Sequence, residues 1–210
     1  MAMSDAEQVW EEHYGERDRI WSGRVNVRLA EEAASLPPGR ALDLGCGEGG
    51  DALWLAERGW QVTAVDISNT ALERAAATAR ERNLQDRIDF QRHELPDTFP
   101  DGTFDLVSAQ FLHSTVELDR PALLRRAAEA VAVGGTLIIV DHGSAPPWAW
   151  KLDHHHEFPS ADEVVTSLNL DASVWQRRRV ESVEREATGP EGQTAIVTDN
   201  VIVLGRLDTR

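Results

Sequence analysis

A run of glycines after a short apolar segment constrains the fold of this chain more than any other feature. Residues 41–51 read Ala-Leu-Asp-Leu-Gly-Cys-Gly-Glu-Gly-Gly-Asp, and a helical pattern follows them. Gly45, Gly47 and Gly50 have the spacing of a glycine-rich nucleotide loop, in which missing β-carbons permit a tight turn and let a ligand lie against the backbone. The segment therefore predicts a strand, a tight turn and the start of a helix.

Three carboxylates surround these glycines. Asp43 precedes them, Glu48 lies among them and Asp51 follows. A dinucleotide brings a pyrophosphate to the helix N-terminus, where backbone N–H groups and the helix dipole favour negative charge, and nearby carboxylates would repel it. An adenosine ligand with no phosphate and a cationic end suits this loop better.

The segment Asp43-Leu44-Gly45-Cys46-Gly47 resembles, residue by residue, the first motif of the class I S-adenosylmethionine-dependent methyltransferases. The resemblance extends from Trp10 to Leu204. It implies an α/β fold, namely a Rossmann-like three-layer sandwich whose seven-stranded, mostly parallel sheet ends in a C-terminal antiparallel hairpin. It also implies S-adenosyl-L-methionine as the cofactor.

A second acidic residue supports a nucleoside ligand. Asp66 follows the predicted strand from Gln61 to Val65. Its separation from Gly45 is typical of a carboxylate that accepts hydrogen bonds from both ribose hydroxyls. The alternative is that Asp66 only caps the next helix, but Ser68 or Asn69 is better placed for that role.

The resemblance implies further contacts to the cofactor. In this family an acidic residue after the third strand accepts a hydrogen bond from the adenine amino group, and Glu94 is the nearest match, while Ile67 would lie beside the adenine. His93 is expected to be exposed and without a role. The expected cofactor-binding residues are Trp21, Asp43, Gly45, Cys46, Gly47, Asp66, Ile67, Glu94, Leu95, Ala109 and Gln110.

Candidate catalytic residues follow the predicted strand of residues 104–109. Gln110 and His113 come directly after it, and ligands of open α/β sheets bind beyond the carboxyl ends of the strands. A hydroxyl or amine acceptor needs a nearby base, and His113 and His142 are the candidates because histidine titrates near neutral pH. The alternative for His113 is a packed histidine at the start of a helix.

The first 24 residues favour one of two structures. Trp10, His13 and Tyr14 share a face of a predicted helix, and Trp21 follows it. They form either a helix that covers the core or a lid over the site. The resemblance favours the lid, because related small-molecule methyltransferases begin with a similar Trp-x3-Tyr segment and a Trp-Ser-Gly turn that close over the methionine end of the cofactor.

Residues 143–159 are expected to shape the pocket of the methyl acceptor, because insertions at this place commonly do so in the family. The segment contains the run His154-His155-His156. Histidine clusters bind transition metals, but adjacent histidines point in different directions and no Cys or His pair at ligand spacing is near. We therefore expect no metal, with the histidine run left open as the only candidate.

Composition bounds the partners and the location. The net charge of −15 disfavours nucleic acid, because a nucleic-acid binder needs a basic face. Cys46 is the only cysteine, so no internal disulfide is expected, and the N-terminus lacks a signal-peptide pattern. No apolar run approaches the roughly 20 residues that span a bilayer. These features predict a cytoplasmic protein with one domain over residues 1–210, which the resemblance implies to be a methyltransferase domain, as a monomer or homodimer.

The predicted function is methyl transfer from S-adenosylmethionine to a small-molecule acceptor, through a thiol, chalcogen oxyanion, hydroxyl or amine. The chain looks most like small single-domain enzymes of the tellurite-resistance and thiol-methyltransferase type. Two alternatives remain. One is a sensor that binds S-adenosylmethionine without transferring its methyl, and the other is a dinucleotide-dependent oxidoreductase, which Asp43 and the C-terminal hairpin disfavour.

Overall fold

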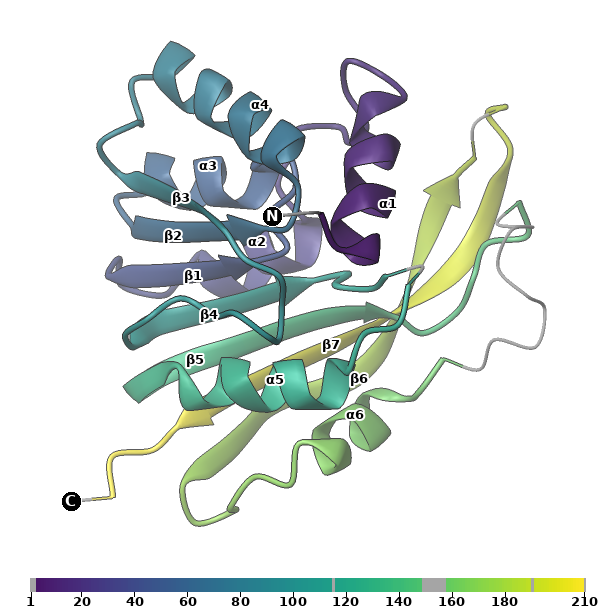
Figure 1. The fold of residues 1–210 in the computed structure, drawn as a ribbon. Coiled ribbons are helices and arrows are strands. Elements are labelled where there is room, and N and C mark those ends of the chain that lie inside the picture. The colour runs from purple at the N-terminus through teal and green to yellow at the C-terminus, as the bar shows by residue number, and fades with distance from the viewer. Residues whose placement is uncertain (1–2, 115, 149–157, 190, 210) are drawn as a thin grey trace.

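The computed structural model describes residues 3–114, 116–148, 158–189 and 191–209, which form one twisted sheet with helices on both faces (Figure 1). The strands are β1 Arg40–Leu44, β2 Gln61–Asp66, β3 Ile88–Arg92, β4 Phe104–Gln110, β5 Val131–His142, β6 Trp175–Thr188 and β7 Thr194–Arg206. The helices are α1 Asp5–Gly15, α2 Val27–Ala33, α3 Gly50–Glu57, α4 Asn69–Glu81, α5 Arg120–Glu129 and α6 Ala161–Ser167.

The strand order of the sheet confirms the predicted architecture. The described strands form a seven-stranded sheet in the order β3-β2-β1-β4-β5-β7-β6. Strands β1 to β5 pair in parallel, whereas β7 is antiparallel to both β5 and β6. The sheet is therefore mostly parallel with a C-terminal antiparallel hairpin.

Two apolar layers hold the helices against the sheet. Helices α2, α3 and α4 contribute to the core on one face, and α5 and α6 contribute to the core on the other. The central strands β1 and β4 are buried along most of their length, as expected for parallel strands that are covered on both sides. The sheet thus forms the middle layer of a three-layer sandwich.

The boundary between α5 and β5 differs from the sequence-based prediction. The pattern predicts a helix from Asp119 to Val133, but α5 ends at Glu129 and Val131 already begins β5. Val131 pairs with Phe104 at the start of β4 and is fully buried. A β-branched residue favours a strand at such a position, so tertiary pairing ends the helix earlier than its periodicity suggests.

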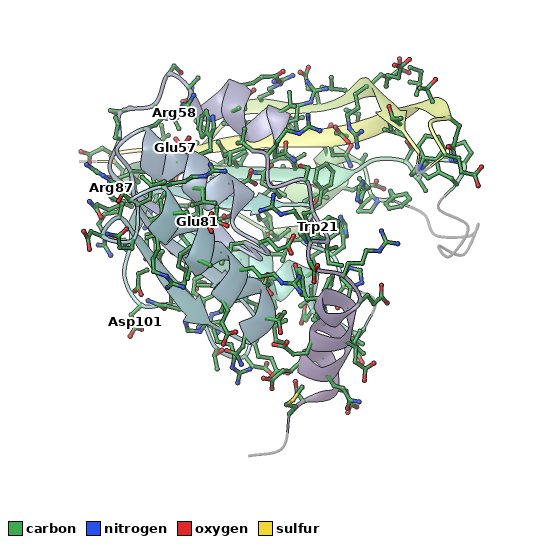
Figure 2. The ribbon with its side chains drawn as sticks, turned by 90° about the horizontal axis from the view of Figure 1, so that it is seen from above. Trp21, Glu57, Arg58, Glu81, Arg87 and Asp101 are labelled. Atoms are coloured by element: carbon green, nitrogen blue, oxygen red, sulfur yellow. The ribbon has the colours of Figure 1, made fainter. Side chains whose placement is uncertain are left out.

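The N-terminal segment lies across the carboxyl ends of the parallel strands. Helix α1 stands beyond the arrowheads of β1 and β2 (Figure 1), and Ser4 caps it by accepting a hydrogen bond from the Glu7 amide. Figure 2 shows Trp21 beside α1, well away from the exposed Glu57 and Arg58 at the far end of α3. In the described part of the chain, no helix has the length and apolar character needed to span a membrane.

Candidate functional site

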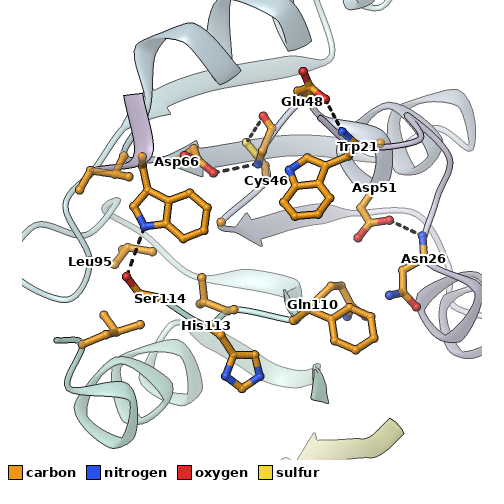
Figure 3. A pocket seen from close by; sticks show the side chains of 18 of the residues that line it. Trp21, Asn26, Cys46, Glu48, Asp51, Asp66, Leu95, Gln110, His113 and Ser114 are labelled. Atoms are coloured by element: carbon orange, nitrogen blue, oxygen red, sulfur yellow. Dashed lines mark hydrogen bonds between the residues drawn. The ribbon is translucent and has the colours of Figure 1, made fainter. Parts of the chain in front are cut away.

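A cavity of about 1120 Å³ opens at the carboxyl ends of the parallel strands (Figure 3). The glycine loop and the ends of β2 and β4 form its floor, and the segment before β1 forms its roof. Residues of β6 and β7 line its far end. The volume lies slightly above the range of about 300–1,000 Å³ that is usual for small-molecule sites, so the cavity has room for more than one small ligand.

The glycine loop is fixed by Asp66, at the end of β2. The Gly47 amide donates to Asp66 Oδ2 at 2.8 Å, and the Ser68 amide donates to Asp66 Oδ1 at 3.0 Å. Ser68, in turn, caps α4 by accepting a hydrogen bond from the Ala71 amide. Asp66 is therefore not the cap of α4, and it lines the cavity with oxygens that can each accept more than one hydrogen bond.

Two glycines allow the loop to pass close to its neighbours. Gly45 and Gly47 have φ angles of +68° and +52°, a region that L side chains rarely adopt. A β-carbon on Gly47 would lie 2.9 Å from the Tyr14 hydroxyl, and one on Gly45 would lie 2.5 Å from Leu112 Cδ1. The backbone of this loop is thus exposed to the cavity in a way that other residues would prevent.

Buried carboxylates make the glycine-loop end of the cavity electronegative. The glycine-loop end consists of Gly45–Gly47, Glu48, Asp51 and Asp66. Burial raises the pKa of Asp51 to about 6 and also raises that of Asp66. Burial, Asp51 and Asp66 together raise the pKa of the neighbouring Asp43, whose Oδ2 has no hydrogen-bond partner among the described residues. A cation bound here would relieve both the burial and the mutual repulsion of these groups.

Glu48 ties the N-terminal segment to the glycine loop. Its carboxylate accepts hydrogen bonds from the backbone amides of Ile20 and Trp21 and from the Arg74 guanidinium, the last two at 2.9 Å. The Trp21 indole donates to the Tyr14 hydroxyl at 3.0 Å, and Tyr14 is almost fully buried. Two aromatic side chains are thereby held over Gly47.

Helix α1 makes additional contacts on both sides of the cavity. The Trp10 indole donates to the Ser114 hydroxyl at 3.3 Å, beyond the end of β4. Glu11 accepts hydrogen bonds from the Asn69 and Thr70 amides at the start of α4. The segment therefore covers the cavity, as a lid would; its ordering by a ligand stays a prediction.

The end of β4 contributes a strained turn and an oriented amide. Gln110 Nε2 donates to the Ser108 hydroxyl at 2.9 Å, which leaves its buried Oε1 without a partner among the described residues. Phe111 follows with a φ of +50°, and its ring lies against His142 with 4.4 Å between centroids. A bulky residue with positive φ marks local strain, which is often stored at functional sites.

His113 lies beside a buried ion pair. Its Nε2 is 3.6 Å from Asp141 Oδ1, and Asp141 is bound by the Arg120 guanidinium. Burial raises the pKa of Asp141, although Arg120 opposes this effect. His142 lies parallel to His113 with 5.5 Å between ring centroids, and burial lowers the pKa of His142. His113 therefore has a carboxylate at hand that would stabilise its protonated form.

The structure brings most of the predicted site residues together. The residues that line the cavity are Trp21, Gly45, Cys46, Gly47, Asp66, Ile67, Glu94, Leu95, Gln110 and His113. Asp43, Ala109 and His142 do not line it. Side chains alternate along a strand, so Ala109 points to the α5 side of the sheet and away from Gln110. His142 lies behind Phe111, and Asp43 is buried within β1.

Several lining residues were not expected from the sequence. His93, predicted to be exposed and idle, is half-buried in the lining, and its Nδ1 has no hydrogen-bond partner within the described residues. Arg28, Arg185 and Asp199 line the end formed by β6 and β7, which we call the hairpin end and define by these three residues. Asp199 interrupts the apolar run of β7, which is the sequence signal that could have identified it.

The histidine run His154–His156 lies outside the described residues. Within the residues that are described, no group of three or more His, Cys, Asp or Glu side chains is arranged to hold a metal ion. The outer part of the expected acceptor loop, residues 149–157, likewise lies outside the described range.

Comparisons with known proteins agree with this geometry. Residues 41–135 match the family model of a methyltransferase domain. The chain is 31% identical to 27-O-demethylrifamycin SV methyltransferase of Amycolatopsis mediterranei over 179 residues, which are 79% of this chain and 64% of that protein. It is 32% identical to thiocyanate methyltransferase 1 of Brassica oleracea over 148 residues, which are 68% of this chain and 65% of that protein. The chain thus spans just under two thirds of the length of either relative.

A solved structure with the same fold covers nearly the whole chain. It comes from work on the conversion of a disulfide bond into a thioacetal group during echinomycin biosynthesis, and it matches with a TM-score of 0.71 and 26% identity over 97% of this chain and 94% of that one. These comparisons support placing the chain among the class I S-adenosylmethionine-dependent methyltransferases. The same similarity indicates that the chain binds S-adenosylmethionine. The comparisons give no support to an oxidoreductase or to a sensor.

Proposed function

We propose that the protein transfers the sulfonium methyl of S-adenosylmethionine to a small-molecule acceptor. The observation that carries this proposal is one cavity that joins the ligand-binding glycine loop to His113 and to the hairpin end. The relatives named above are methyltransferases whose names specify small acceptors. Net charge disfavours a nucleic-acid acceptor.

The lining residues fit the cofactor. The free lone pairs of Asp66 suit the two ribose hydroxyls, and the apolar side chains of Ile67 and Leu95 suit the faces of the adenine. Glu94 is the acceptor proposed for the adenine amino group. The raised pKa of Asp51 marks a carboxylate that gains from a cation, so we assign it to the ammonium of the methionine moiety.

The cofactor supplies an electrophilic methyl group on a sulfonium sulfur. The protein's part is to hold the nucleophile in line with that methyl and to exclude water. Trp10, Tyr14 and Trp21 provide the cover over the cavity. For a hydroxyl or amine acceptor, His113 is the proposed base, and Asp141 stabilises the protonated imidazole across 3.6 Å.

We extend the proposal to the organisation and location of the protein. Residues 1–210 act as one domain, residues 1–24 as its lid and residues 143–159 as a wall of the acceptor pocket. The free thiol of Cys46 is compatible with a reducing compartment, so we place the protein in the cytoplasm, as a monomer or homodimer. The similarity to thiocyanate methyltransferase 1 supports the assignment to the tellurite-resistance and thiol-methyltransferase type of enzyme.

Two measurements test the function. S-adenosylmethionine or S-adenosylhomocysteine should raise the melting temperature, because a ligand that binds the native state adds RT ln(1 + [L]/Kd) to stability. NAD and NADP serve as controls and should not raise it. Methyl transfer from labelled cofactor should then be measured with thiols, phenols, amines and chalcogen oxyanions. Loss of the first effect, or no transfer to any acceptor of the panel, contradicts the proposal.

A further inference from the structure

Two buried polar atoms at the hairpin end have no hydrogen-bond partner among the described residues. They are Arg28 Nε, from α2, and Asp199 Oδ1, from β7. Both residues line the cavity, and Asp199 is only 1% exposed. Buried polar groups are nearly always paired, because an unmade hydrogen bond costs the desolvation of that group. An unpaired donor and an unpaired acceptor on one cavity wall indicate a place for a ligand.

The two atoms belong to one ion-pair network. Asp199 Oδ2 accepts a hydrogen bond from Arg185 Nε at 2.7 Å. Arg28 Nε lies 3.9 Å from the same oxygen, which is close enough for an ion pair but too long for a hydrogen bond. Asp199 Oδ1 and the Arg28 Nε–H group therefore lie near each other with hydrogen-bonding capacity to spare.

An anionic group does not suit this place. It would meet the unpaired Asp199 oxygen, and the lining of the whole cavity holds nine Asp or Glu residues against three Arg. The Asp and Glu residues are Glu48, Asp51, Asp66, Glu94, Asp97, Glu117, Asp119, Glu186 and Asp199, and the arginines are Arg24, Arg28 and Arg185. A local concentration of one sign of charge repels ligands of that sign.

A cationic group does not suit it either. Arg28 and Arg185 flank the carboxylate, so a cation at Asp199 Oδ1 would have two guanidinium groups as near neighbours. Removing a charge from water is costly unless an opposite charge in the site compensates it. The Asp199 carboxylate already compensates the two arginines. A neutral group that both donates and accepts a hydrogen bond meets neither objection.

The strand register places this pair on the acceptor side of the cavity. Asp199 of β7 pairs directly with His142 of β5, whose ring lies parallel to that of His113. Asp66 and the glycine loop lie at the ends of β2 and β1, on the other side of β4 in the sheet. A group held by Asp199 is therefore part of the acceptor and not of the cofactor.

We propose that Arg28 and Asp199 bind an uncharged hydroxyl group of the acceptor, whose O–H donates to Asp199 Oδ1 and whose oxygen accepts from Arg28 Nε. The inference rests on the proposed function, since it names the class of acceptor for the same cavity. The two residues determine specificity by orienting an uncharged hydroxyl group of the acceptor.

The test uses four ligands that differ in one substituent. Benzyl alcohol, toluene, benzoate and benzylamine present a hydroxyl, no polar group, an anion and a cation on the same ring. Dissociation constants are measured by ligand-observed NMR on the full chain, with and without S-adenosylhomocysteine. Benzyl alcohol should bind roughly tenfold more tightly than each of the other three, as two hydrogen bonds to charged partners provide at least this preference.

Substitution at the pair should remove this preference. In Asp199→Asn the preference for benzyl alcohol should fall to about twofold, because the charged acceptor is lost. Asp162→Asn is the matched control, since Asp162 pairs with Arg177 on the surface, and it should leave the preference unchanged. If Asp199→Asn does not fold, Arg28→Lys removes the Nε–H donor and should have the same effect.

The outcomes separate the inference from the proposed function. Equal binding of benzyl alcohol and toluene would mean that the pair holds only water, and tighter binding of benzoate or benzylamine would mean that it holds a charged group. Each of these results overturns the inference, even if S-adenosylhomocysteine raises the melting temperature. No stabilisation by S-adenosylhomocysteine overturns the proposed function, and the ligand comparison can still be made on the cofactor-free protein.

Discussion

The glycine-loop end and the hairpin end of the cavity are held together by different kinds of contact. At the glycine-loop end, carboxylates accept hydrogen bonds from backbone amides, as Asp66 does from Gly47 and Ser68. At the hairpin end, side chains pair with side chains, as Asp199 does with Arg28 and Arg185. The first arrangement fixes the path of the chain, and the second fixes the position of a few charged groups.

This difference has a consequence for what each end can recognise. A backbone amide is present whichever residue carries it, so the glycine-loop end keeps its geometry through most substitutions, provided that its glycines and carboxylates remain. A single substitution of Arg28 or Asp199 would change the chemistry of the hairpin end without moving the loop. Such a division between the two ends would let related enzymes keep the same cofactor while their acceptors differ.

The largest expected effect comes from removing the cover that both ends share. Deletion of residues 1–23 takes away Trp10, Tyr14 and Trp21 and should reduce methyl transfer by roughly a hundredfold or more, because water would enter and the reacting groups would lose their alignment. The truncated protein should still unfold cooperatively, since Tyr14 is the only buried hydrophobic residue among residues 3–23, the described part of this segment. Turnover and calorimetric melting are the measurements.

The opposite outcome is equally informative. If the truncated protein aggregates or has no melting transition, the segment is part of the core and not a lid. The contact of Glu11 with the start of α4 would then be the cause. The deletion removes Glu11 and leaves the Asn69 and Thr70 amides without their hydrogen-bond acceptor.

The sequence predicted the glycine-loop end well because local rules govern it. Glycines with positive φ, a carboxylate after β2 and a serine cap on α4 are each read from residues close together in the chain. The inaccurate predictions lie elsewhere in the sheet and depend on strand pairing: alternation along β4 turns Ala109 away from the cavity, and β pairing of Val131 shortens α5. Neither can be known before the strand register is known.

The next largest effect concerns Asp66 alone. Asp66→Ala removes the carboxylate that fixes Gly47 and is assigned to the ribose, and it should weaken cofactor binding by roughly 1–3 kcal/mol, which is about 5- to 150-fold in Kd. Titration calorimetry with S-adenosylhomocysteine measures it, and Asp162→Ala on the surface is the control. An unchanged Kd with the fold intact would show that Asp66 serves the loop only.

The hairpin end could not be predicted because it is assembled from distant segments. Arg28 lies on α2, Arg185 on β6 and Asp199 on β7, and only the folded sheet brings them together. An aspartate within an apolar segment was visible in the sequence, but its burial and its two partners were not. Ion pairs between elements that are far apart in the sequence have no fixed sequence spacing, so no motif reveals them.

Asp51 tests whether the glycine-loop end is under electrostatic stress. Its pKa is raised from the ordinary value of 3.8 to about 6, so between these values the native state holds a proton that the unfolded state has lost. The free energy of unfolding therefore falls as pH rises through this window, by up to about 3 kcal/mol. Asp51→Asn removes this slope and should gain stability relative to the wild type at pH 7 but not at pH 4.

The same substitution should have the opposite effect on cofactor binding. An ionised Asp51 favours a cation, so the wild type should bind S-adenosylmethionine more tightly at pH 7.5 than at pH 5, and Asp51→Asn should reduce this difference. Denaturant unfolding and calorimetry at both pH values provide the measurements. Identical pH profiles for the two proteins would mean that burial does not perturb Asp51.

The smallest expected effect concerns Glu48, which joins the cover to the glycine loop. Glu48→Gln keeps one carbonyl oxygen that can accept from the Trp21 amide. It loses the negative charge that strengthens the hydrogen bonds from Arg74 and from the Ile20 amide. A loss of about 1 kcal/mol, or roughly fivefold in the Kd of S-adenosylhomocysteine, follows from the hydrogen bonds that weaken. Glu57→Gln is the matched control, because Glu57 forms an exposed pair with Arg82 at a similar distance. The rate of methyl transfer should fall by a larger factor than the affinity for the cofactor, since a looser cover admits water to both ends of the cavity. Equal losses of rate and affinity would mean that Glu48 acts on the glycine loop and not on the cover.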